Sequence, residues 1–297
     1  MTTSSMFDTM LERVSAGDRL GPDDLELLAG TPDILQVGML ADTLHRSLHG
    51  TRVSYLRVAL CPYDKPFTEA VPLAAREVRV TGKPESLDVA VTAIEAARAV
   101  AGERAVSAFS WLDIERLAGT GAEKKVLQRL RVAGLDALAE FPLDRVTDSR
   151  AALESIVSAG YTQVRLTIDK TPADARTKLF TTAADLKETY PAIRSINPLP
   201  SVLDSLRPTT GYEDVKSVAL ARLAAPNIPD VQVDWLRYGP KLAQVALTFG
   251  ANDLDNVQPS DEAPDGRRRA PLEEVRRNIQ AAGFEPAERD GRFVLIG

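Results

Sequence analysis

The chain has very few of the residues that bind metals or act as nucleophiles. Its 297 residues include one cysteine, Cys61, and two histidines, His45 and His49. One cysteine excludes an internal disulfide, and a hydrolase triad is not expected because no serine lies in a nucleophile-elbow sequence. The two histidines stand four positions apart on a predicted helix, a spacing that can grip a metal. No third ligand follows from the sequence, so packed or solvated histidines are favoured.

The chain also lacks an excess of positive charge and a long apolar run. It has 36 lysines and arginines against 42 aspartates and glutamates, a net charge of −6, which disfavours binding to nucleic acid or to an anionic membrane surface. No apolar run reaches the roughly 18 residues of a spanning helix. The first residues have neither the basic nor the apolar segment of a signal peptide. These absences predict a cytoplasmic protein without a nucleic-acid partner.

Helical and strand patterns follow one another in an order typical of a barrel. Three helices are predicted at 6–15, 22–28 and 34–48, and short β-branched runs then alternate with helical periods. The expected fold class is therefore α/β, a (β/α) TIM-like barrel, closed or partial. It would consist of an N-terminal helical cap at 1–50, the barrel at 51–256, and a mobile loop with a C-terminal helix–strand extension at 257–297. The expected strands are Arg52–Leu60, Arg76–Thr81, Ala105–Phe109, Leu135–Phe141, Thr162–Asp169, Ala192–Pro198 and Val231–Leu236.

Polar residues follow the predicted strands, where barrels place their functional sites. Glu140, Asp169, Lys170 and Arg237 are the candidates for acid/base chemistry, and together they would suit a small anionic or polyhydroxylated ligand. The simpler alternative is that charged residues begin exposed loops. The other residues at predicted strand ends are Cys61, Tyr63, Gly82, Lys83, Ser110, Trp111, Asn197 and Tyr238.

Segments near both ends of the chain resemble one family. They are Arg13-Val-Ser-Ala-Gly-Asp-Arg-Leu-Gly, Arg207-Pro-Thr-Thr-Gly, Gly250-Ala-Asn-Asp-Leu-Asp and Ala282-Gly-Phe-Glu-Pro. These segments resemble the futalosine-pathway radical S-adenosylmethionine enzymes, aminofutalosine synthase and the dehypoxanthine futalosine cyclase. The resemblance implies a role in menaquinone biosynthesis. It also implies a [4Fe–4S] cluster on three cysteines, spaced Cys-x3-Cys-x2-Cys after the first barrel strand.

The chain departs from this family where the cofactors would bind. The region after the first predicted strand contains Cys61 alone, and one residue cannot supply three thiolates. The glycine-rich turn that helps the family to bind the S-adenosylmethionine amino group is not recognisable around Thr81-Gly-Lys-Pro. We therefore expect no cofactor: both the cluster and the S-adenosylmethionine site are predicted to be lost.

The resemblance also places ligand-binding candidates in the last third of the chain. Arg207, in the segment that also holds Thr210, could receive a carboxylate in a bidentate pair. Asn252, Asp253 and Asp255 could hydrogen-bond ribose hydroxyls or a purine. The alternatives remain open: an arginine exposed before a proline turn, a capping box formed by Thr210 with the glutamate three positions on, and an Asn/Asp-rich turn that caps the preceding helix.

Two functions from different classes are compatible with these patterns. The first is a non-radical homologue, a pseudoenzyme that serves menaquinone biosynthesis as a ligand-binding or partner subunit. Its partner would be a paralogous radical enzyme or another protein of that pathway, and its ligand a small nucleoside-like or anionic molecule. The second is a repurposed, cofactor-independent barrel enzyme that uses acid/base residues at the barrel mouth on such a molecule. The first is favoured because loss of the catalytic ligands with retention of the scaffold accounts most simply for the sequence.

Overall fold

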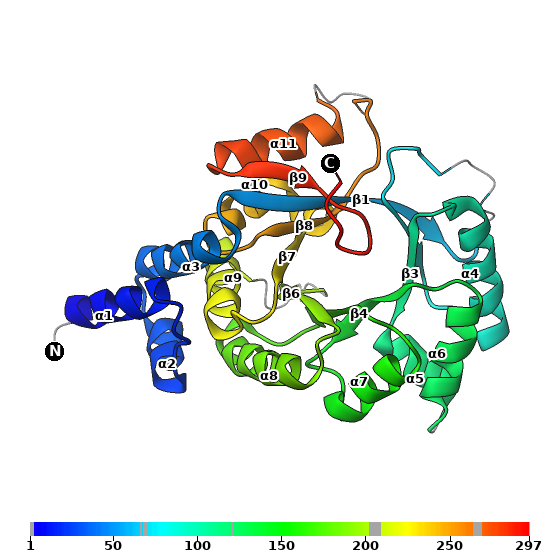
Figure 1. Cartoon of the computed structure of the whole chain (residues 1–297), viewed down its shortest axis with the longest axis horizontal. Coiled ribbons are helices and arrows are strands. Elements are labelled where there is room, and N and C mark those ends of the chain that lie inside the picture. The colour runs from blue at the N-terminus through cyan, green and yellow to red at the C-terminus, as the bar shows by residue number, and fades with distance from the viewer. Residues whose placement is uncertain are drawn as a thin grey trace.

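The computed structural model describes residues 3–65, 67, 71–119, 121–201, 209–263 and 269–296. The three predicted N-terminal helices are present and lie beside the barrel in Figure 1. The third packs on the later helix α9 (Gly211–Ala224), and the first packs on the third. Buried apolar side chains at helical spacing explain this docking. The three helices are α1 (Thr3–Ser15), α2 (Pro22–Gly30) and α3 (Ile34–His49).

Eight parallel strands close into a barrel. β1 pairs with β2 on one side and with β8 on the other, and the strands between them pair in chain order. The expected (β/α) barrel is confirmed, and it is closed. The strands are β1 (Arg52–Pro62), β2 (Glu77–Thr81), β3 (Ala105–Ser110), β4 (Ala137–Pro142), β5 (Val164–Ile168), β6 (Ile193–Pro200), β7 (Asp230–Asp234) and β8 (Asp253–Val257).

Helices surround the ring of strands (Figure 1). All five residues of β5 are buried, as expected for a strand covered on both faces, and α4 turns Ala90, Ile94 and Ala97 onto the sheet. Among the described residues, no helix is both long and apolar enough to cross a bilayer. The outer elements are α4 (Leu87–Ala101), α5 (Trp111–Ala118), α6 (Glu123–Val132), α7 (Ser149–Ser158), a 3-10 turn (Ala173–Ala175), α8 (Arg176–Thr189), α9 and α10 (Trp235–Leu247).

The C-terminal segment adds a ninth strand to the sheet. After α11 (Pro271–Ala281), β9 (Glu285–Glu288) pairs in parallel with the first part of β1, whose last residues pair with β2. This agrees with the helix, turn and strand predicted there. The residues after β9 then turn inward, since the main chain of Gly291 bonds to Arg76 and accepts from Arg165. They therefore cross the N-terminal opening of the barrel.

Two predicted boundaries were wrong near the end of the barrel. The strand predicted over Val231–Leu236 ends at Asp234, because this residue caps α10, which begins at Trp235. The helix that precedes the predicted Asn/Asp-rich turn is α10, which is kinked at Gly239. The Asn/Asp-rich turn, one alternative for Asn252 to Asp255, is not formed, because β8 begins at Asp253 and pairs with β7 and β1.

Candidate functional site

A cavity of about 660 Å³ opens at the C-terminal end of the barrel. Polar and charged side chains from the loops after β2 to β8 face this cavity, which we call the mouth pocket. Its position and volume are those expected of a ligand site in a barrel. The residues that line it are Leu60, Arg79, Val80, Thr81, Gly82, Lys83, Phe109, Ser110, Leu112, Asp113, Ala139, Glu140, Pro142, Arg145, Asp169, Lys170, Ser201, Asp234, Arg237 and Asn256.

All four acid/base candidates from the sequence line the mouth pocket. Two of them form an ion pair, with Arg237 Nη2 at 3.5 Å from Glu140 Oε1. Asp169 is paired with Arg145 at 3.0 Å and also accepts a hydrogen bond from Ser201 Oγ. Both carboxylates therefore already have a cationic partner.

Lys170 has a fixed backbone and a free side chain. Asp144 accepts the main-chain N–H groups of Asp169, Lys170 and Thr171, which holds the loop after β5 in one conformation. Burial alone would raise the pKa of Asp144, but these hydrogen bonds lower it below its ordinary value. Within the described residues, the ammonium groups of Lys170 and Lys83 have no ion-pair partner, and both side chains are exposed at the pocket. The pocket thus offers two unpaired positive charges.

Asp234 is a carboxylate at the pocket wall that the sequence did not single out. Its side chain is 6% exposed, caps α10 by accepting the Arg237 N–H at 2.8 Å, and accepts from Asn256 Nδ2 at 3.1 Å. Burial, and then the charge of Asp255, raise the pKa of Asp234. Asn256 adopts a φ of +63°, a left-handed conformation that asparagine tolerates, where its side chain meets this carboxylate.

The opposite side of the mouth pocket carries a set of apolar side chains, which we call the apolar wall, beside the polar Lys83 and Glu140. Leu60, Val80, Phe109, Leu112 and Pro142 come from β1 to β4 and the loops that follow them. Phe109 is buried with a φ of +57°, which is unusual for a bulky residue and costs conformational energy. A flat or apolar part of a ligand could pack against this wall, with its polar groups toward β5 to β8.

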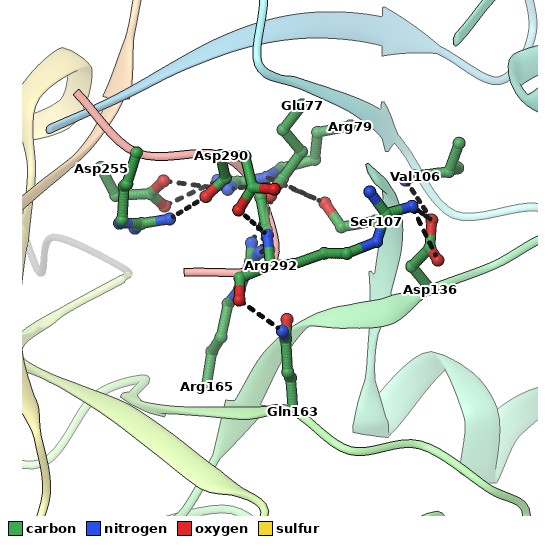
Figure 2. Close-up of polar contacts among 12 residues, drawn as sticks. Glu77, Arg79, Val106, Ser107, Asp136, Gln163, Arg165, Asp255, Asp290 and Arg292 are labelled. Carbon is green, nitrogen blue, oxygen red and sulfur yellow. Dashed lines mark hydrogen bonds and ion pairs between the residues drawn. The ribbon is translucent and has the colours of Figure 1, made fainter. Parts of the chain in front are cut away.

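A buried ion network fills the barrel below the pocket. Glu77 receives two hydrogen bonds from Arg165, at 3.0 and 2.5 Å, and two from Arg79, while Arg79 also pairs with Asp255 (Figure 2). Burial alone would raise the pKa of Glu77, but Arg165 and Arg79 lower it well below its ordinary value. Arg79 is shared between this network and the pocket lining, so the network forms the floor of the mouth pocket.

The last residues of the chain close this network from below. Arg289 forms a bidentate pair with Asp253, at 2.6 and 2.7 Å, and Phe293 lies 4.1 Å from the Arg289 guanidinium. Figure 2 shows Arg292 reaching from this segment toward Asp136, while its carbonyl accepts from Gln163. The barrel interior is therefore occupied at its lower end, and the mouth pocket is the part open to a ligand.

Comparison with known proteins places the C-terminal part of the chain in a family. Residues 199–295 match the family described as CofH/MqnC C-terminal region. The chain is a CofH/MqnC-like relative of the radical S-adenosylmethionine enzymes.

Curated relatives match this CofH/MqnC-like chain over most of its length. The 5-amino-6-(D-ribitylamino)uracil--L-tyrosine 4-hydroxyphenyl transferase of Archaeoglobus fulgidus is 26% identical over 280 residues, which cover 82% of this chain and 81% of the relative. The aminodeoxyfutalosine synthase of Thermus thermophilus is 25% identical over 361 residues, covering 95% and 94%. Among solved structures, methylornithine synthase superposes with a TM-score of 0.66 at 15% identity, over 94% of this chain and 97% of that one. At this level of identity, the similarity to methylornithine synthase shows a shared fold and nothing about function.

The CofH/MqnC-like chain has one cysteine, where the resemblance implies three for a cluster. Cys61, the only cysteine, is half-buried near the end of β1, and burial raises the pKa of its thiol, which disfavours the thiolate that a cluster needs. The part of the chain that the structure describes contains no group of three histidine, cysteine, aspartate or glutamate side chains able to hold a metal. At the turn after β2, the Tyr63 ring packs on Gly82, where an added Cβ would lie 2.5 Å from it.

Four of the five ligand-binding candidates, Thr210, Asn252, Asp253 and Asp255, are not among the described residues that line the mouth pocket. Arg207 lies outside the described residues. Thr210 caps α9, its Oγ1 accepting the Glu213 N–H at 3.2 Å while Glu213 accepts in return, so the alternative of a capping box is confirmed. Asn252, Asp253 and Asp255 are buried, and all three are bonded to protein groups. A ligand role for these five residues stays a prediction.

Asn252 has a structural role, because it links three elements of the fold. Its Oδ1 accepts from the buried Arg222 and from the main-chain N–H of Val231, and its Nδ2 donates to Asp230 at 2.9 Å. It therefore ties the start of β8 to α9 and β7. The family-like segment that begins at Gly250 leads into β8, where Asp253 and Asp255 bond to Arg289 and Arg79 inside the barrel.

Asp234 is one of the pocket residues that sequence reasoning missed, and a local signal was present. An aspartate before an apolar helix is an N-cap pattern, and it marks the end of a strand followed directly by a helix. Reading Val231–Leu236 as one strand placed its end two residues too late and selected Arg237 in its place. Both side chains belong to the same βα junction.

Proposed function

We propose that this chain is a CofH/MqnC-like protein without an iron–sulfur cluster, which binds a small anionic ligand in its mouth pocket. The observation that carries the proposal is the pair of unpaired lysines, Lys83 and Lys170, in a pocket whose carboxylates Glu140 and Asp169 are already bound by arginines. A ligand that brings negative charge would find two free cationic partners there. Because its relatives carry out the radical chemistry, the chain would serve as a ligand-binding or partner subunit.

The names of the relatives support the choice of ligand. The Archaeoglobus protein is named for a D-ribitylamino-uracil and tyrosine, and the Thermus protein for aminodeoxyfutalosine. We propose that the ligand of this chain likewise joins a flat ring, packed on the apolar wall, to a charged or hydroxylated part at the polar wall. A nucleoside-like molecule of menaquinone biosynthesis has this form, and a paralogous radical enzyme is the proposed partner.

Anaerobic purification from cells that co-express the iron–sulfur assembly machinery tests the loss of the cluster. We expect a colourless protein without stoichiometric iron, since one cysteine cannot provide the three thiolates of the cluster. A visible spectrum of a stoichiometric [4Fe–4S] cluster would overturn this part of the proposal. Native mass spectrometry of the same sample would detect a small molecule or a partner chain that purifies with the protein.

Binding of defined probes tests the anionic ligand directly. 4-Methylbenzoate and its neutral analogue 4-methylbenzamide have the same ring and nearly the same shape, and calorimetry would compare their affinities. We expect the wild-type protein to bind the benzoate more tightly than the benzamide. The double variant K83A/K170A should lose this preference, because the two lysines supply the free positive charge. Equal affinity for both probes in the wild-type protein would contradict a site for anions.

A cofactor-independent enzyme is the alternative, and one observation favours it. Asp234 is buried beside the pocket and its pKa is raised, which are properties of a group that can exchange a proton. Glu140 and Asp169 are less suited because each already forms an ion pair with an arginine. Incubation of any co-purified ligand with the protein would distinguish the two, since a change in the mass of the ligand indicates catalysis.

A further inference from the structure

Asp234 has more hydrogen-bonding capacity than the protein uses. Its Oδ1 accepts from the Arg237 main chain and, at 3.3 Å, from Asn256, while Oδ2 accepts from Asn256 at 3.1 Å. A carboxylate offers about four acceptor positions in total. Within the described part of the chain, no lysine or arginine side chain pairs with Asp234, although its side chain is 6% exposed. Burying such a group is costly unless a further partner is supplied.

The capping role of Asp234 does not account for an aspartate at this position. Serine, threonine or asparagine would cap α10 equally well and would bring no charge into a buried site. The protein has other aspartate caps, such as Asp148 before α7, but that side chain is exposed and does not line the pocket. Among these two caps, Asp234 alone faces the mouth pocket.

The order of the strands places Asp234 across the pocket from the apolar wall. In the closed ring, β7 lies opposite β3, whose end carries Phe109. Lys170 follows β5 and Lys83 follows β2, so the two free lysines lie on either side of Asp234 around the ring. A ligand whose ring packs near Phe109 and whose anionic group meets one of the lysines would have a third position facing Asp234.

We propose that Asp234 recognises a hydrogen-bond donor of the ligand, an amine or the N–H of a nitrogen heterocycle, through its free acceptor positions. The inference rests on the proposed function and deepens it. The site then binds molecules that combine an anionic group with a nitrogen donor at some distance from it. A ligand with the anionic group alone leaves the free acceptor positions of Asp234 unused, and is bound less tightly.

A matched pair of probes tests this inference. 4-(Aminomethyl)benzoate adds one amine to 4-methylbenzoate and keeps its ring and carboxylate. Isothermal titration of the full chain with each probe gives the affinity contributed by the amine. We expect the wild-type protein to favour the aminomethyl probe by roughly tenfold or more, as expected of a charge-assisted hydrogen bond.

The D234N variant removes the charge but keeps an oxygen that can cap α10, so it is expected to fold. It should lose the preference for the aminomethyl probe over 4-methylbenzoate. The D148N variant is the matched control, since it makes the same change at an exposed cap away from the pocket, and it should keep the preference.

The outcomes separate this inference from the proposed function. If the wild-type protein binds both benzoates equally well, or if D234N keeps the preference for the aminomethyl probe, the role of Asp234 is wrong, while the site for anions stands. If the wild-type protein binds neither probe, both proposals are overturned. Loss of the preference in D148N as well as D234N would also overturn the inference, because the effect would then follow from weakened caps.

Discussion

The stability of the barrel interior depends on the buried side chain of Glu77. Arg165 and Arg79 both bond to it inside the barrel. We expect E77Q to lower the free energy of unfolding by roughly 3–5 kcal/mol, because removal of one partner leaves buried guanidinium charge uncompensated. Urea denaturation followed by circular dichroism measures this loss.

The control for E77Q is D88N. Asp88 pairs with Arg129 at the surface, where the Asp88 side chain is 85% exposed. We expect this variant to change the stability by less than about 0.5 kcal/mol, because exposed pairs are screened by solvent. Similar losses in the two variants would show that the barrel network contributes no more than a surface pair.

Asp234 also predicts how ligand binding depends on pH. Burial and the neighbouring Asp255 raise its pKa above the ordinary aspartate value, so it becomes protonated at a higher pH than an exposed aspartate. The affinity for 4-(aminomethyl)benzoate should therefore fall as the pH is lowered through this raised pKa, since the neutral acid no longer attracts the amine. The affinity of D234N for the same probe should show no such fall with pH. A fall of equal size in D234N would mean that another group than Asp234 causes the pH dependence.

At the scale of elements, the segment after β9 is held inside the barrel by close packing at Gly291. A Cβ added at this residue would lie 2.6 Å from Glu77 Oε2 and 2.7 Å from Ala105 Cβ. We expect G291A to destabilise the protein by about 1–3 kcal/mol, the usual cost of an overpacked site. Thermal unfolding would be compared with G30A, where nothing lies within 4 Å of an added Cβ and the stability should hardly change.

The start of α9 distinguishes capping from ligand binding. Thr210 and Glu213 form a reciprocal capping box there. T210A should lower the stability by about 1 kcal/mol, because the helix loses one side-chain cap. Titration of T210A with the benzoate probes tests the predicted ligand role of Thr210. If Thr210 binds the ligand, T210A should lose more probe affinity than the D148N control does.

At the scale of the whole molecule, the two histidines of α3 predict loss of stability in acid. His45 is fully buried and stacks on Phe284, with ring centroids 4.7 Å apart. Burial and the nearby Arg222 charge lower the pKa of His45 to about 3 and that of His49 to about 4. The unfolded chain binds protons near the ordinary value of 6.5, so stability is present above that pH and is lost as the pH falls toward these lowered pKa values.

The size of this effect can be measured from the slope of stability against pH. His45 alone should contribute on the order of 2 kcal/mol between about pH 7 and about pH 4.5. H45Q removes the titration of this residue, so its curve should be flatter than that of the wild-type protein over the same interval, whatever its absolute stability. Parallel curves would mean that His45 is not buried in its neutral form.

The sequence alone was enough to predict the barrel, its N-terminal helices and seven of its strands. It was enough because alternation, helical spacing and turn residues are local patterns that report which face of an element is buried. The same reasoning predicted that Glu140, Asp169, Lys170 and Arg237 lie at one end of the barrel, since parallel strands end on the same side. It missed β8 because Asp253 and Asp255 suggest a turn when their partners are unknown.

Only the tertiary structure decided which charges meet. Glu77 and Arg165 are 88 positions apart and Arg79 and Asp255 are 176 apart, so no local pattern relates them. Closure of the barrel brings these pairs together in its interior, and it turns Asp234 from a helix cap into a wall of the mouth pocket. The sequence by itself determined the number of cysteines and the order of the elements. The burial of polar groups, on which their pKa values and ligand affinity depend, follows from the register of strands that are distant in the chain.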